Sequence, residues 1–135
     1  DLKLIYPNIT ASLRAGVFVK EPGPRFQVHG TFGSFIKYCL DPQEAALKAG
    51  KMPDSKNFGA EPVKNFGLLN SAAHAKSIRA RYATFPGYYM GFYDDVFATL
   101  EGHKSPEVSP EDALLNLKII EAAFKSHREK LIIKL

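Results

Sequence analysis

The sequence of 135 residues contains a single cysteine, Cys39, so no disulfide can form within it. Because disulfides are rare in reducing compartments, this favours a cytoplasmic protein. No run approaches the ~20 apolar residues of a membrane-spanning helix, and no signal peptide opens the sequence. With 45% hydrophobic and 24% charged residues, the composition is typical of a soluble globular protein. We expect the chain to bury a hydrophobic core.

Motifs that hold phosphates, metals or nucleophiles are also lacking. Neither the P-loop pattern nor G-x-G-x-x-G occurs. Gly30 and Gly33 have G-x-x-G spacing, but a strand follows where the dinucleotide fingerprint needs a helix. Asp94 and Asp95 are helix neighbours that diverge by about 100°, so we expect both to be solvated rather than paired in catalysis. No metal-ligand spacing joins the four histidines, which are His29, His74, His103 and His127.

The first forty residues show the period of two that is typical of strands. Leu2–Tyr6 reads as a strand, and apolar residues alternate along 13–20. The turn residues of 21–24 end that run, and two more strands are expected over 25–29 and 34–38. A further hairpin is expected from Leu68–Asn70 and roughly Ala75–Arg81.

Helix signals dominate the second half. Asp41, Pro42 and Glu44 predict a capped short helix that Gly50 ends. A helical pattern begins at Tyr88, and Ser109-Pro110 opens the longest predicted helix, with one apolar face. A last strand is expected over 131–135. The predicted fold class is α+β: a mostly antiparallel open sheet with helices packed on one face and the other face available for subunit contacts.

The net charge of +4 permits a nucleic-acid partner. The basic residues are scattered, however, and the aromatic residues have the spacing of a helix core. The G-x-x-G spacing could also suggest an RNA-binding loop, but a tight turn between strands is the simpler interpretation. We therefore expect neither a nucleic-acid nor a membrane partner.

Several segments together resemble the glucose-fructose oxidoreductase, inositol dehydrogenase and rhizopine-catabolism (Gfo/Idh/MocA) family. The resemblance covers nearly the whole sequence and rests on the order and spacing of five segments: Arg25–Tyr38, Leu40–Ala45, Leu47–Gly50, Tyr88–Tyr93 and Ile119–Ala123. Two departures are local. Cys39 stands where relatives usually have glycine, and Asn57-Phe58-Gly59 stands where a tryptophan-glycine pair is common.

The resemblance implies a two-domain enzyme that transfers a hydride between NAD or NADP and a sugar, an inositol or a related polyol. Its amino-terminal Rossmann domain would bind the cofactor, and residues 1–135 would be the carboxy-terminal domain that shapes the substrate pocket and forms a homodimer or larger oligomer through the sheet face. The family's Glu-Lys-Pro lysine and its Asp/His helix pair are absent here. We therefore expect no catalytic residue, no bound cofactor and no metal in this chain, which would be inactive alone.

By the same resemblance, the turn from Lys20 to Arg25 should face the cleft between the two domains. The candidate substrate-binding residues are Lys20, Glu21, Arg25 and Tyr93, which would orient substrate hydroxyls by hydrogen bonding. An alternative is a free-standing, self-associating interaction module without enzyme activity. The strand pattern at the first residues argues against it, because natural proteins seldom begin inside a strand.

Overall fold

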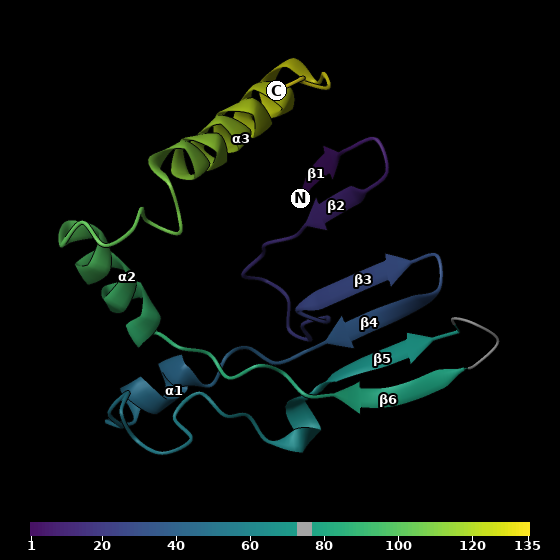
Figure 1. Ribbon diagram of the computed structural model, residues 1–135. Coiled ribbons are helices and arrows are strands. Elements are labelled where there is room, and N and C mark those ends of the chain that lie inside the picture. The colour runs from purple at the N-terminus through teal and green to yellow at the C-terminus, as the bar shows by residue number, and fades with distance from the viewer. Residues whose placement is uncertain (73–76) are drawn as a thin grey trace. The chain divides into compact units, whose positions relative to one another are not determined.

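The computed structural model describes residues 1–72 and 77–135, and the chain divides into two compact units (Figure 1). The sheet unit comprises Glu21–Asp94. The terminal unit comprises Asp1–Lys20 together with Asp95–Leu135. Each unit is described by itself below.

In the sheet unit, the described strands form one antiparallel sheet in chain order. They are β3 (Phe26–Gly30), β4 (Gly33–Lys37), β5 (Gly67–Ser71) and β6 (Ile78–Tyr82). The strands predicted over 25–29 and 34–38 and the later hairpin are confirmed, with small shifts at their ends. Ala75, the expected start of the last strand, lies outside the described residues.

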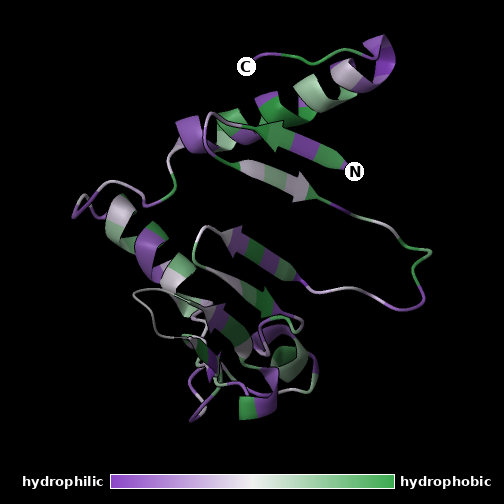
Figure 2. Cartoon of the chain, turned by 90° about the vertical axis from the view of Figure 1, so that its right-hand side faces the viewer, coloured by the Kyte–Doolittle hydropathy of each residue, from purple (hydrophilic) through white to green (hydrophobic). Residues whose placement is uncertain are grey.

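The register gives the sheet two different faces. Val28 pairs with Phe35, Phe35 with Leu69, and Leu69 with Ala80, so these side chains share one face. We call this the apolar face; its large members are Phe26, Val28, Phe35, Leu69, Ile78 and Tyr82. The opposite, polar face carries mainly Gln27, His29, Ser34, Asn70, Arg79 and Arg81. Figure 2 shows the alternation of hydrophobic and hydrophilic residues along the strands.

The short helix α1 (Gln43–Lys48) follows the sheet's second strand, and its start differs from the prediction. Pro42 is the N-cap residue and makes no side-chain cap hydrogen bond. The Asp41 carboxylate instead accepts from the backbone N–H of Gln43 at 2.8 Å. With Pro42 as the N-cap residue, Glu44 is the second residue of the helix and completes no capping box; it pairs instead with Lys48 one turn later at 2.6 Å. The predicted capping box is therefore wrong.

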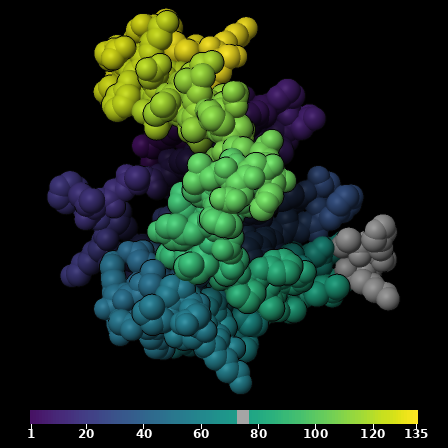
Figure 3. Space-filling model, turned by 60° about the vertical axis from the view of Figure 1, so that its left-hand side comes forward, coloured from purple at the N-terminus to yellow at the C-terminus, as the bar shows by residue number. Residues whose placement is uncertain are grey.

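The end of α1 agrees with the prediction. Gly50 has a φ of 77°. Its N–H donates to Leu47, and the N–H of Lys51 donates to Ala46. This is the Schellman motif, which favours glycine at the left-handed position. The loop that follows contains the 3₁₀ turn η1 (Val63–Asn65). In Figure 3 the blue atoms of α1 and of the early part of this loop form one continuous mass.

The terminal unit contains a hairpin of β1 (Leu2–Ile5) and β2 (Thr10–Leu13), paired Leu2 to Leu13. The strand predicted over 13–20 is wrong, because residues 14–20 are irregular. β1 supplies four paired positions, and residues 10–13 occupy all of them. An alternating pattern alone does not satisfy the N–H and C=O groups of a strand, which also needs a neighbour.

The helix α2 (Met90–Leu100) begins two residues after the predicted start, and α3 (Pro110–Glu129) follows it. The cap predicted for α3 is confirmed: Ser109 accepts from the N–H of Asp112 at 3.1 Å, and the Asp112 carboxylate accepts from the N–H of Ser109. The strand predicted over 131–135 is wrong. Lys130 adopts a left-handed conformation, the Leu131 carbonyl accepts from the Ser126 hydroxyl, and the tail stays irregular.

The predicted fold class, α+β with a mostly antiparallel sheet, is confirmed. That the helices cover one sheet face stays a prediction, as does a single domain over residues 1–135. The expected hydrophobic core is not observed: within the described residues no hydrophobic side chain is buried, and the buried side chains are Lys37 and Gln43. No helix in the described ranges is long and apolar enough to cross a membrane.

Candidate functional site

A cavity of about 280 Å³ lies within the sheet unit, at the end of β4. Its walls come from β3 and β4, from the residues before α1, from the loop after α1 and from the segment that precedes α2. The lining residues combine charged, small and aromatic side chains: Arg25, Phe26, Lys37, Cys39, Leu40, Asp41, Pro42, Gly59, Glu61, Thr84, Phe85 and Gly87. An apolar pocket with a few convergent polar groups is the usual form of a small-molecule site.

Lys37 is the best-connected side chain of this cavity. Lys37 is only 8% exposed, and its Nζ donates to both carboxylate oxygens of Glu61, at 2.7 and 2.9 Å. It also donates to the Asn65 carbonyl at 3.0 Å and to the Thr84 hydroxyl at 3.1 Å. Burying a lysine is costly unless it is paired and hydrogen-bonded, and this network meets both conditions.

Asp41, which lines the cavity, forms a second network with Gln43 at the start of α1. The Gln43 side chain is almost fully enclosed, and its Nε2 donates to Asp41 Oδ2 at 2.9 Å. Its Oε1 accepts from the backbone N–H of Tyr89 at 2.9 Å. Gly87 lies directly against both side chains, and a Cβ there would overlap them. The residues just before α2 are thereby fixed to the start of α1.

The predicted site residues are only partly brought together. Arg25 lines the cavity. Glu21 is exposed at the start of the sheet unit, and Lys20 ends the first segment of the terminal unit. Tyr93 is exposed on α2, where its ring meets Phe92 edge to face at 5.3 Å. The substrate-binding roles of all four stay predictions.

The neighbouring carboxylates on α2 have separate partners, as their divergence predicts. Asp94 is exposed, as expected, whereas Asp95 is half-buried in an ion pair, so the expectation that it is solvated is wrong. The Tyr88 hydroxyl donates to Asp94 at 2.5 Å, and this hydrogen bond and the carboxylate's charge raise the pKa of Tyr88. Asp95 pairs with Lys104 at 2.5 Å, and hydrogen bonding to that ammonium lowers the pKa of Asp95. Neither carboxylate lines the cavity.

Sequence reasoning missed Lys37, Glu61, Thr84 and Gln43. A signal for the first was present, because Lys37 lies two residues after Phe35 and therefore shares the apolar face of β4. A charged residue at such a position calls for a buried partner. Nothing in the sequence identified Glu61 as that partner, since it lies 24 residues away.

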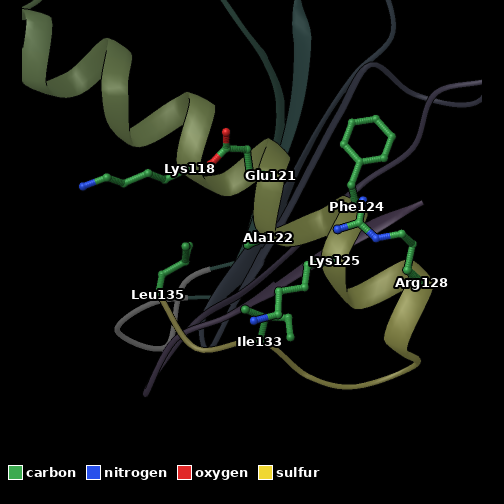
Figure 4. Close-up of a pocket in the computed structure, with 8 residues that line it drawn as sticks. All are labelled: Lys118, Glu121, Ala122, Phe124, Lys125, Arg128, Ile133 and Leu135. Atoms are coloured by element: carbon green, nitrogen blue, oxygen red, sulfur yellow. The ribbon is translucent and has the colours of Figure 1, made fainter.

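A larger depression of about 690 Å³ lies in the terminal unit between α3 and the tail (Figure 4). Its cationic residues are Lys118, Lys125 and Arg128, and their side chains point in different directions in Figure 4. Because they do not converge, we take the cavity of the sheet unit as the candidate site.

The fold is that of a known class of domain. The family model described as the oxidoreductase family, C-terminal alpha/beta domain (Gfo/Idh/MocA) matches residues 2–135, and the chain belongs to this family. The resemblance found in the sequence is thereby confirmed.

Relatives include scyllo-inositol 2-dehydrogenase (NADP(+)) IolW of Bacillus subtilis, 34% identical over 99% of this chain and 37% of that protein. The oxidoreductase YhhX of Escherichia coli is 34% identical over 93% of this chain and 36% of that protein. An oxidoreductase structure from Bacteroides fragilis superposes with a TM-score of 0.87 at 41% identity, covering 96% of this chain and 38% of that one. The chain thus spans little more than a third of the length of these relatives.

Proposed function

We propose that this chain is the substrate-side domain of an NAD(P)-dependent oxidoreductase that acts on a sugar, an inositol or a related polyol. In the reaction, a substrate alcohol is oxidised to a carbonyl: the hydride of its C–H bond reduces the nicotinamide and its O–H proton is released, or the reverse. The name of the relative IolW, with its inositol substrate and NADP, supports the polyol and the cofactor class. The chain would not catalyse this reaction alone.

The observation that carries the proposal is the cavity of the sheet unit, together with which of its charged side chains already have a partner within the protein. Lys37 and Glu61 bind each other, and Asp41 binds Gln43. Among the described residues, no carboxylate forms an ion pair with Arg25, although Arg25 lines the same cavity. A guanidinium offers several N–H donors in a fixed plane, which suits the hydroxyl oxygens of a polyol.

The cofactor would be held by a Rossmann domain elsewhere in the full natural protein. The sequence supports this assignment, because it has no G-x-G-x-x-G motif of its own. Lys20, Glu21 and Tyr93 would complete the substrate contacts from the side that faces the cofactor. We also expect the protein to act in the cytoplasm, given its lone cysteine.

The test is steady-state kinetics of the full natural protein with NAD or NADP and a panel of inositols and sugars. Arg25→Ala should raise KM about tenfold or more, since a hydrogen bond from a charged group is worth ~1.5–3 kcal/mol. The matched control is Arg79→Ala, which removes the same group from the polar face of β6. Equal kinetics for the two variants would remove Arg25 from the site, and no turnover of any polyol would refute the proposed reaction.

We further propose that the apolar face joins two copies of the chain. Phe26, Val28, Ile78 and Tyr82 are each more than half exposed on this face. Large exposed apolar patches mark interaction surfaces, and a two-fold dimer would cover the same patch on both copies.

A matched pair on β3 tests the dimer, because neighbouring strand residues point to opposite faces. Val28→Lys should shift the full natural protein to monomers in analytical ultracentrifugation, whereas Gln27→Lys should not. An unchanged mass for Val28→Lys would exclude this face as the interface. A dimer of a protein that binds no nicotinamide cofactor would favour the alternative, a self-associating interaction module.

A further inference from the structure

Lys37 is the buried cation of the candidate cavity, so it is the residue most easily taken for a proton donor to the substrate. An ammonium group has three N–H donors. The Lys37 ammonium already faces four acceptor atoms, at 2.7 to 3.1 Å: both Glu61 oxygens, the Asn65 carbonyl and the Thr84 hydroxyl. All of its donors are therefore used within the protein.

The partners of Lys37 come from separate parts of the chain. Lys37 ends β4, Glu61 belongs to the long loop after α1, Asn65 ends η1, and Thr84 lies between β6 and α2. Lys37, Glu61 and Thr84 all line the cavity. One ammonium group thus fixes three walls of the cavity relative to one another.

We infer that Lys37 is a positioning residue: with Glu61 and Thr84 it forms a hydrogen-bonded clamp that sets the shape of the substrate cavity without contacting the reacting atoms. The predicted effects on KM and kcat rest on the proposed function. The predicted effects on stability and on amide exchange rest on the structure alone. The clamp holds the segment before α2, and with it Phe85, at a fixed separation from Glu61. A substrate ring then meets a preformed wall rather than one that must be ordered on binding.

The mechanical test is a double-mutant cycle on the thermal unfolding of the full natural protein. Lys37→Met and Glu61→Met each leave one buried charge unpaired, so each should lower Tm by about 10 °C or more. The double variant removes both charges and should recover most of that loss. A double variant no more stable than the single ones would overturn the clamp.

The kinetic test uses a matched pair of substitutions at Thr84, which leave the Lys37–Glu61 ion pair in place. Thr84→Val removes the hydroxyl with little change of shape, whereas Thr84→Ser keeps it. Thr84→Val should raise KM several-fold, leave kcat and its pH profile unchanged, and speed exchange of the Phe85 and Gly87 amides. Thr84→Ser should behave like the unaltered protein, and equal exchange in the two variants would overturn the inference.

The folded Lys37→Met/Glu61→Met variant separates positioning from proton transfer. We expect it to turn over at a reduced kcat/KM with the pH profile of kcat retained. Loss of kcat at every pH with KM unchanged would make Lys37 a proton donor and overturn the inference. A protein that oxidises no polyol refutes the proposed function, while the unfolding cycle and the amide exchange still decide whether the clamp exists.

Discussion

Replacing the side-chain amide of Gln43 with a carboxylate tests the network that fixes α1 to the segment before α2. Gln43→Glu keeps the shape of the side chain and keeps an oxygen to accept from the Tyr89 N–H. It replaces the Nε2 donor, 2.9 Å from Asp41 Oδ2, with a second carboxylate oxygen. A hydrogen bond to a charged group becomes a repulsion between two carboxylates.

The magnitude follows from the contact. Losing the hydrogen bond costs ~1.5–3 kcal/mol. Two unit charges ~3 Å apart at an effective dielectric constant of ~20 add up to ~5 kcal/mol, part of which local rearrangement relieves. We expect the free energy of unfolding to fall by ~3–5 kcal/mol at pH 7.5. Most of this loss should disappear near pH 4, because a protonated carboxyl at position 43 can donate to Asp41.

The sign of the pH effect is fixed by linkage. The repulsion raises the pKa of the new carboxyl in the folded state above the ~4.3 of an unfolded glutamate. The folded variant therefore binds more protons than the unfolded variant, and its stability falls as pH rises through that range.

The assay is urea unfolding of the full natural protein at several pH values between 4 and 8, with exchange of the Tyr89 amide as a local probe. Gln27→Glu is the matched control, since it makes the same change on the exposed polar face of β3 and should stay within ~0.5 kcal/mol. If both variants lose the same stability with the same pH dependence, the assigned role of Gln43 is wrong.

Three further predictions concern local packing and capping. Gly67→Ala should cost ~1–3 kcal/mol, because a Cβ at this position overlaps the Phe35 ring, whereas Gly23→Ala meets open space and serves as its control in the same urea assay. Ser109→Ala should lower stability by ~1 kcal/mol and reduce helicity in circular dichroism, because it removes the cap of α3, and unchanged helicity would count against the cap. Hydrogen bonding to Ser109 lowers the pKa of Asp112, so the stabilisation by this carboxylate is present above ~pH 4 and is lost as pH falls through the lowered pKa. An Asp112 resonance that titrates in NMR at an ordinary aspartate pKa would contradict this.

Local signals predicted much of the fold. The alternation over 25–38 gave β3 and β4, Gly50 gave the end of α1, and Ser109-Pro110 gave the start of α3. Each of these features depends on residues within about five positions of one another, which sequence patterns capture.

Patterns failed where a strand needed a distant neighbour. Residues 14–20 alternate like a strand, and 131–135 are apolar like one, yet both are irregular. The pattern indicates what a strand would place on each face, but not whether another strand is available to pair with it.

By itself, the sequence determined the family resemblance, the fold class, the end of α1, the cap of α3 and the lack of the usual cofactor and metal motifs. The tertiary structure alone decided the candidate site. It brought Lys37 to Glu61 across 24 residues and Gln43 to the Tyr89 N–H across 46. Such pairs depend on the path that the loops take over the fold, which the local sequence does not show. A buried charge or amide needs a hydrogen-bonding partner, and only the tertiary structure decides which residue lies close enough to be one.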